Sequence, residues 1–243
     1  MNKGKGTRPG CTVNALTLIG SMAEEKLLKN SYWHSTNFIT MPTILIVDDH
    51  SIVRKGLLYH CRVEFGYPDV GEADSCPGLM AALRRKAYTH LILDLSLGDE
   101  STLEILPNVR RLYPSLNILI FSMLRFEWYE ATLRYYGIRH FISKDSPETE
   151  TVRLLKLFLN NPNSMRDAPV QPGNDTDFAT LSPRETEVLY YLLRGETNAA
   201  IAERLNMLPG NVATYKQRIF HKTSTENVIQ LKERIDNLSR RPG

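Results

Sequence analysis

In Thr43-Ile-Leu-Ile-Val-Asp-Asp-His50, an apolar run ends abruptly in two carboxylates, a pattern that indicates the class of fold. Short apolar runs bounded by polar residues indicate buried strands. Four further runs follow, and segments with helical periodicity separate them. Short turns between alternating strands and helices force parallel strands with right-handed crossovers, so the sequence predicts a doubly wound α/β domain with a five-stranded parallel sheet. The expected strands are 43–47, 69–73, 90–95, 116–121 and 138–142, and the expected helices are 52–65, 78–87, 102–113, 127–136 and 148–159.

Polar side chains stand at the predicted ends of four of these strands. Asp48 and Asp49 follow the first run, and Asp94 closes the third. Ser122 follows the fourth run and Lys144 follows the fifth. Because function in an open parallel sheet lies beyond the carboxyl ends of the strands, we expect these side chains to meet at one edge. Taken singly, such an aspartate is usually a turn former or helix cap and such a lysine is usually solvated, but the joint pattern predicts a phosphoacceptor site.

The chemistry expected at this edge is a metal-assisted phosphoryl transfer onto a carboxylate. Mg²⁺ prefers oxygen ligands, so Asp49 and Asp94 are the predicted direct ligands, with Asp48 binding directly or through water. The backbone carbonyl of Ser96 would complete the set. Asp94 would attack the phosphorus and become an aspartyl phosphate. Lys144 would then pair with the transferred oxygens, and the Ser122 hydroxyl would donate to another.

A second, helical domain follows a segment rich in Pro, Asn, Asp and Gly. That composition predicts a flexible linker over 161–179, after a first domain at 42–160. Ser182-Pro-Arg-Glu185 has the pattern of a capping box at the start of a helix. Helices expected at 198–205 and 210–222 are joined by a turn of helix-turn-helix length. We therefore predict an all-α four-helix domain over 180–243, with ten basic against seven acidic residues.

One face of the predicted helix 210–222 carries polar side chains suited to the major groove. Gln can pair with adenine there and Arg with guanine, and basic side chains can hold phosphates. An ordinary four-helix bundle with a charged, solvated face would show the same spacing. The predicted contacts with double-stranded DNA are Asn211, Thr214, Lys216, Gln217, Arg218 and Lys222.

The first domain resembles the receiver domain of two-component response regulators. The resemblance rests on Ile46-Val-Asp-Asp-His50, Leu93-Asp-Leu95, Phe121-Ser122 and Gly137 to Lys144-Asp145. It implies a flavodoxin-like fold, a sensor histidine kinase as the phosphoryl donor, and phosphorylation and dephosphorylation that the domain itself catalyses at Asp94. It also implies that Phe141 is a switch residue, whose ring turns inward as the Ser122 hydroxyl moves toward the phosphate.

The second domain resembles the LuxR-type helix-turn-helix, and the order of the two domains is that of NarL/FixJ-type response regulators. The motifs are Leu181-Ser-Pro-Arg-Glu-Thr-Glu-Val-Leu189, Gly195-Glu-Thr-Asn198, Ile201-Ala-Glu-Arg-Leu205 and Val212-Ala-Thr214. The resemblance implies promoter DNA as a partner and a homodimer in the active form. It places dimerisation on the last helix, where Val228 and Leu231 lie three residues apart.

Several residues depart from these two families. Gly98 replaces the usual proline four residues after the phosphoacceptor, Thr102 stands where glycine is common, and Met123 follows Ser122 where smaller residues are frequent. Leu208 replaces a serine cap, which should cost the recognition helix about 1 kcal/mol. Ala213 replaces a common DNA-contacting lysine, which should lower the affinity for DNA.

Composition sets the remaining bounds. Three cysteines without CxxC spacing suggest neither a disulfide framework nor a zinc site, so a reducing cytoplasm is expected. No apolar run reaches the ~18 residues of a spanning helix, so no membrane partner is expected. Residues 1–41 show no clear periodicity, and we interpret them as a disordered extension or a misassigned start in preference to a functional arm.

The sequence therefore predicts a DNA-binding transcription regulator controlled by phosphorylation of Asp94. It is not expected to be an enzyme beyond its own phosphorylation and dephosphorylation. A phosphatase with an aspartyl-phosphate intermediate is a rival, but such enzymes need an acidic residue where Ser96 stands. A nearer alternative is a DNA-binding regulator whose receiver acts without phosphate, which the altered 96–102 loop keeps open.

Overall fold

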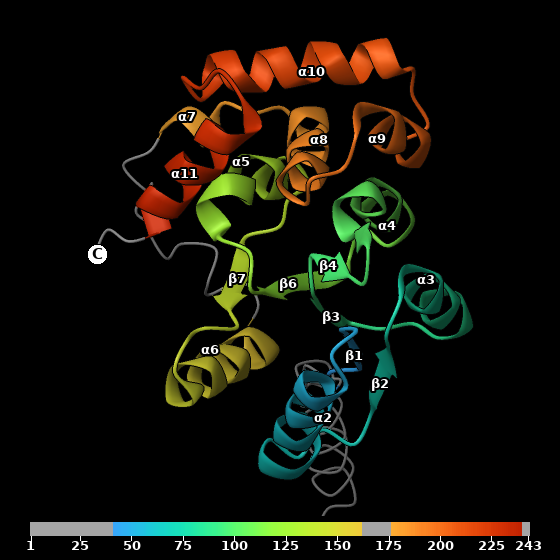
Figure 1. Ribbon diagram of the computed structural model, residues 1–243. Helices are drawn as coiled ribbons and strands as arrows, with labels where there is room; N and C mark the ends of the chain where they lie inside the picture. Colours follow the sequence, from blue (N-terminus) through green and yellow to red (C-terminus); the bar gives the residue numbers. More distant parts are fainter. Residues whose placement is uncertain (1–40, 162–175, 240–243) are drawn as a thin grey trace, which may run out of the picture. The chain divides into compact units, whose positions relative to one another are not determined.

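The computed structural model of this chain describes residues 41–161 and 176–239. Five short strands form one parallel sheet in the order β2-β1-β3-β6-β7 (Figure 1). That order is the flavodoxin-like arrangement, and it confirms the predicted doubly wound fold. The strands are β1 (Ile44–Val47), β2 (Val70–Ala73), β3 (His90–Leu93), β6 (Asn117–Ser122) and β7 (His140–Ser143).

Helices cover both faces of this sheet, because successive strand residues point to opposite sides. In β1, Ile44 and Ile46 join one apolar cluster, whereas Leu45 and Val47 join the other. The first cluster is covered by α2 (Ser51–Tyr59), its π-helical continuation (His60–Glu64) and α6 (Glu148–Asn160). The second is covered by α3 (Cys76–Arg85), α4 (Leu106–Leu112) and α5 (Phe126–Tyr135).

A small antiparallel hairpin follows β3, where the sequence predicted only a loop. Its two strands are β4 (Ser96–Leu97) and β5 (Glu100–Ser101), and Gly98 at the turn has a φ of +61°. A single turn of 3-10 helix (Thr102–Glu104) comes next, so the helix expected over 102–113 is split and α4 begins only at Leu106. The hairpin thus stands directly beside the carboxyl end of β3.

The C-terminal domain is helical, as predicted. Ser182 and Glu185 form the expected reciprocal capping box at the start of α8. The four residues of α7, which the linker prediction for 161–179 included, form a short helix whose Phe178 belongs to the C-terminal core. The helices are α7 (Thr176–Ala179), α8 (Pro183–Leu193), α9 (Asn198–Arg204), α10 (Pro209–Lys222) and α11 (Val228–Ser239).

Other predictions concern segments that the structure does not describe. The proposed extension at 1–41, apart from its last residue, and positions 162–175 of the linker lie outside the described residues. Within 41–161 and 176–239, no helix combines the length and the apolar character that crossing a membrane requires.

The two residues on α11 predicted to mediate dimerisation differ in burial, so the role stays a prediction for Val228 while Leu231 has no surface available for it. Leu231 has no exposed surface and lies in the core of the C-terminal domain, and half-buried Val228 packs against the same core. Their spacing of three residues therefore marks the stripe by which α11 packs on its own domain. Between them, the side chain of Ile229 is 71% exposed to solvent.

The burial of Leu231 and the exposure of Ile229 predict unequal effects for truncating these two neighbouring residues. Leu231→Ala leaves a cavity in the core and should lower the free energy of unfolding of the C-terminal domain by about 2–5 kcal/mol. Ile229→Ala removes an exposed side chain and should change it by less than about 0.5 kcal/mol. Urea denaturation followed by circular dichroism measures both. Equal effects of the two variants would contradict the assignment of Leu231 to the core.

Candidate functional site

The polar residues predicted at the strand ends do meet at one edge of the sheet. The last sheet hydrogen bonds place them there: the Asp94 amide donates to the Val47 carbonyl at 2.9 Å, and the Lys144 amide donates to the Ser122 carbonyl at 3.0 Å. Each side chain therefore begins where its strand leaves the apolar layers. The arrangement follows from the sequence, because the apolar runs end at matching registers.

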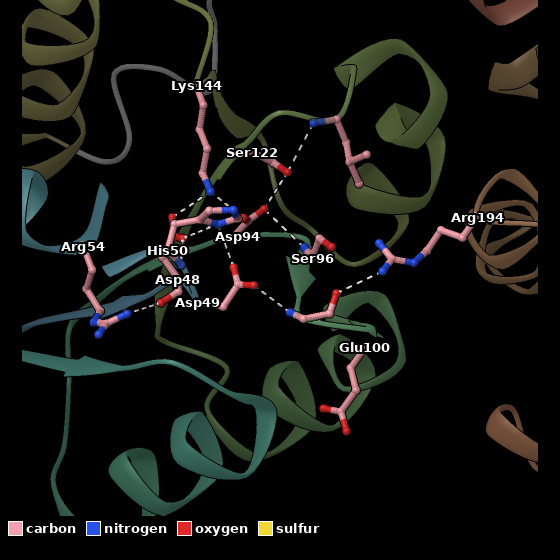
Figure 2. Close-up of polar contacts among 12 residues, drawn as sticks. Asp48, Asp49, His50, Arg54, Asp94, Ser96, Glu100, Ser122, Lys144 and Arg194 are labelled. Carbon is pink, nitrogen blue, oxygen red and sulfur yellow. Dashed lines mark hydrogen bonds and ion pairs between the residues drawn. The ribbon is translucent and has the colours of Figure 1, made fainter. Parts of the chain in front are cut away.

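Asp94 lies at the centre of the cluster (Figure 2), and it is only 3% exposed. The Ser122 hydroxyl donates to Asp94 Oδ1 at 2.6 Å, and the Ser96 amide donates to the same oxygen at 3.2 Å. Lys144 Nζ lies 2.5 Å from the other oxygen, Oδ2. Both carboxylate oxygens are thus held by donors that could transfer to a phosphoryl group attached at this position.

Lys144 links two of the carboxylates. Its ammonium lies 2.8 Å from Asp48 Oδ2 as well as beside Asp94, and its side chain is 6% exposed. Burial acts to lower the pKa of Lys144, but the hydrogen bonds and charges of Asp48 and Asp94 outweigh it and hold the pKa above its ordinary value. Lys144 is therefore a fixed positive charge in the site.

The cluster has the composition of a site for a hard divalent cation. Ligand atoms of Asp48, Asp49, His50 and Asp94 all lie within 4.8 Å of one another. Three of the four residues offer carboxylate oxygens, which are the donors that Mg²⁺ prefers. The imidazole Nδ1 of His50 lies 2.8 Å from Asp49 Oδ1. His50 therefore belongs to the cluster, although the sequence analysis assigned it no role. The donor set fits Mg²⁺ held by Asp49 and Asp94, with Asp48 beside them.

The hairpin explains two residues that depart from the resembled family. Gly98 donates its amide hydrogen to Asp49 Oδ2 at 2.9 Å, and its positive φ suits glycine but excludes proline. Thr102 is fully buried, and its hydroxyl donates to the Asp94 carbonyl at 2.9 Å. Glycine at position 102 could not make that bond. These departures therefore help to hold Asp49 and Asp94 in place.

The predicted switch residue lies near this site on β7. The half-buried ring of Phe141 packs against the ring of Phe126, with 5.2 Å between the centroids. Met123, the other departure noted at the rim, is 58% exposed beside the buried Ser122. The inward rotation proposed for Phe141 stays a prediction.

On α10, the residues predicted to read base edges lie on the solvent side. Val212, Ile219 and Phe220 are buried, and they anchor the helix to α8 and α9. The opposite side carries a set of exposed polar side chains, which we call the reader face: Asn211, Thr214, Gln217 and Arg218.

The two lysines predicted to hold phosphates differ in their surroundings. Lys216 is half-buried, with its ammonium 5.8 Å from the centre of the Phe220 ring. Lys222 lies 2.7 Å from Glu185 Oε2 and donates to the Thr180 carbonyl at 2.9 Å. Lys222 therefore closes an ion pair within its own domain. The absence of a side-chain cap on Leu208, expected from the sequence, is also seen.

Comparison with known families divides the chain in the same way. Residues 44–156 match the response regulator receiver domain, and residues 179–233 match the bacterial regulatory proteins of the luxR family. The first match spans the sheet and its carboxylate cluster. The second spans α8, α9 and α10.

Individual relatives share both domains. Response regulator UvrY of Escherichia coli K12 is 24% identical over 200 residues, which are 79% of this chain and 92% of that protein. Response regulator GacA of Pseudomonas protegens is also 24% identical, over 79% of this chain and 93% of its own length. RcsB of Salmonella enterica serovar Typhimurium, solved bound to the promoter rprA with the phosphomimetic BeF3−, superposes with a TM-score of 0.69. It is 26% identical, and the match covers 80% of this chain and 98% of that one.

The hairpin geometry predicts that the proline expected from the family is harmful here. Gly98→Pro removes the amide donor to Asp49 and cannot adopt the positive φ, so it should lower the free energy of unfolding by at least about 1 kcal/mol. Gly98→Asn keeps the amide, and asparagine tolerates this region, so it should cost less. Thermal denaturation of both variants tests this. A Gly98→Pro protein as stable as the parent would show that the turn is not a constraint.

Proposed function

We propose that this chain, which belongs to the response regulators that join a receiver domain to a LuxR-type DNA-binding domain, controls its binding to promoter DNA through phosphorylation of Asp94. The observation that carries the proposal is the pairing of both Asp94 oxygens with Ser122 and Lys144, beside Asp48 and Asp49. A lone structural aspartate would need neither partner nor the acidic pair.

In the proposed reaction, a carboxylate oxygen of Asp94 attacks the phosphorus of a phosphohistidine on a sensor kinase. The new oxygen–phosphorus bond forms as the phosphorus–nitrogen bond breaks, and the leaving imidazole takes a proton. As negative charge shifts from the Asp94 carboxylate to the phosphoryl group, Lys144 and the Ser122 hydroxyl change their hydrogen-bond partners from carboxylate oxygens to phosphoryl oxygens. Mg²⁺ bound by the carboxylates would offset the repulsion between them and the incoming phosphoryl group.

The proposed output is the reader face of α10. A helix anchored by one apolar stripe, with amide and guanidinium side chains on its free side, fits the major groove of duplex DNA. RcsB of Salmonella, similar over both domains, was solved on promoter DNA with a phosphomimetic, which supports extending this activity to the present chain. We further propose that the active form is a homodimer. The alternative without phosphate control predicts the same DNA affinity with and without beryllofluoride.

Asp94→Asn should abolish acid-labile labelling by acetyl phosphate and Mg²⁺, because the amide cannot serve as the nucleophile. The matched control is Asp74→Asn, which neutralises an exposed aspartate after the neighbouring strand β2. Mass spectrometry should show a phosphoryl adduct on the parent and on the control. An adduct of equal yield on the Asp94→Asn protein would remove Asp94 as the phosphoacceptor.

Gln217→Ala combined with Arg218→Ala should weaken promoter binding by tenfold or more, since each good base contact contributes about 1–3 kcal/mol. The control pair, Lys232→Ala with Asn237→Ala, removes one cation and one amide from the exposed side of α11 and should change the affinity far less. Gel-shift titration at fixed salt compares them, and circular dichroism checks the fold. Equal affinities for the two double variants would refute the reader face.

A further inference from the structure

Arg54, at the end of the first turn of α2, reaches back to the residue that follows β1. Its Nη1 donates to the backbone carbonyl of Asp48 at 2.6 Å (Figure 2). Its Nε donates to Glu72 Oε2 at 2.9 Å, on the neighbouring strand β2. The side chain of Arg54 is 15% exposed, whereas that of Glu72 is 51% exposed. A largely buried guanidinium therefore joins β2 to the first residue of the acidic pair.

The other polar groups of Asp48 also have partners. Its amide donates to the Ala73 carbonyl at 3.2 Å. Its Oδ1 accepts from the His50 amide at 2.9 Å, and its Oδ2 lies 2.8 Å from the ammonium of Lys144. Asp48 is only 1% exposed, so its carbonyl would be buried and unsatisfied if the guanidinium were removed. The bond from Arg54 thus completes the set of contacts that holds Asp48.

The carbonyl of Asp48 belongs to the peptide group that leads into Asp49. The hydrogen bonds of the sheet end one residue earlier, where the Val47 carbonyl accepts from the Asp94 amide at 2.9 Å. A peptide group is planar, so a donor that fixes its oxygen also fixes the direction in which the chain continues. Arg54 therefore orients the first peptide beyond the sheet, and with it the residue that carries a predicted cation ligand.

The charge of Arg54 and its hydrogen bond act on a bound cation in opposite directions. A positive charge near a cation site repels the ion, so the charge by itself weakens binding. A peptide held in place strengthens binding, because a carboxylate that is already oriented need not be ordered when the cation arrives. The sign of the change on removing the guanidinium therefore distinguishes positioning from electrostatic repulsion.

We propose that Arg54 is a positioning residue for the cation site, and that it acts by holding the peptide between Asp48 and Asp49. The inference rests on the proposed function, in which Asp49 and Asp94 hold Mg²⁺. Glu72 contributes by fixing the Nε side of the guanidinium, which leaves Nη1 directed at the carbonyl. Arg54 acts through the backbone of Asp48 and is not itself a ligand.

The test measures binding of Mn²⁺ to the full-length protein. Mn²⁺ takes the same kinds of oxygen ligand as Mg²⁺, and its electron paramagnetic resonance signal counts the ion that remains free. Arg54→Met removes the donor and should raise the dissociation constant for Mn²⁺ by about tenfold. Arg54→Lys keeps the charge but cannot bond both partners as the guanidinium does, so it should raise the constant by about threefold.

The matched control is Arg153→Met, which deletes an exposed guanidinium paired with Glu150 on α6. This variant should bind Mn²⁺ like the parent, and thermal denaturation checks that every variant is folded at the titration temperature. An Arg54→Met protein that binds Mn²⁺ as tightly as the parent, or more tightly, overturns the positioning role. If Arg54→Met does not fold, Arg54→Lys decides alone, and a constant equal to that of the parent overturns the role.

A further variant separates this inference from the cation site on which it rests. Asp49→Asn removes a predicted ligand and should bind Mn²⁺ more weakly than Arg54→Met does. If Asp49→Asn binds Mn²⁺ as tightly as the parent, the proposed cation site falls, and the role of Arg54 falls with it. If Asp49→Asn binds weakly while Arg54→Met binds like the parent, only the positioning role is lost.

Discussion

Repulsion between the carboxylates at one edge of the sheet governs where the strands that carry them end. Asp48 and Asp94 are both buried, and both form an ion pair with the ammonium of Lys144. A buried carboxylate without a partner costs several kcal/mol, so β1, β3 and β7 must end at registers that bring these three groups together. The remaining negative charge, with Asp49 beside it, accounts for an edge whose chemistry suits a hard cation and a transferred phosphoryl group.

The hairpin extends this constraint to the second domain. A peptide group has two polar ends, and in Gly98 one end faces Asp49 while the other faces Arg194. The left-handed turn that makes this possible requires a residue such as glycine. The departure from the family at position 98 therefore contributes one of the contacts between the two domains. Thr102, the second departure, also holds the site in place, because its hydroxyl donates a hydrogen bond to the carbonyl of Asp94.

The sequence predicts those parts of the molecule that periodicity specifies. Apolar runs and their spacing are enough to predict the parallel sheet and the position of Asp94 among its neighbours, and the polar motif Ser182-Pro-Arg-Glu185 is enough to predict the capping box. Two-residue strands have no period, so the β4–β5 hairpin could not be seen. Leu231 was misjudged because spacing reveals an apolar stripe but not the surface that the stripe meets.

The sequence of α8 indicates that this helix is covered on more than one side, but a search for a single apolar stripe does not detect it. Val188 to Leu193 is an unbroken apolar and aromatic run, and every residue from Glu185 to Leu192 is buried. A helix that is apolar on all sides must be covered on all sides. The other helices of a small domain cannot cover every side of α8, so part of its surface needs a neighbour from outside that domain. Tyr190 and Tyr191 fit that situation, because each buries a ring and presents a hydroxyl to the hairpin.

Exposure of the reader face limits how regulation can operate. Asn211, Gln217 and Arg218 stay exposed while α8 is docked on the receiver, so docking does not act by covering these side chains. Under the proposed function, control therefore acts on how the two reader faces of a homodimer are presented to one operator. In the structure, the contacts of α8 with the receiver fix the orientation of α10, and the proposal requires that orientation to change so that α10 matches a half-site spacing. In this proposal, phosphorylation of Asp94 changes DNA binding without contacting the reader face.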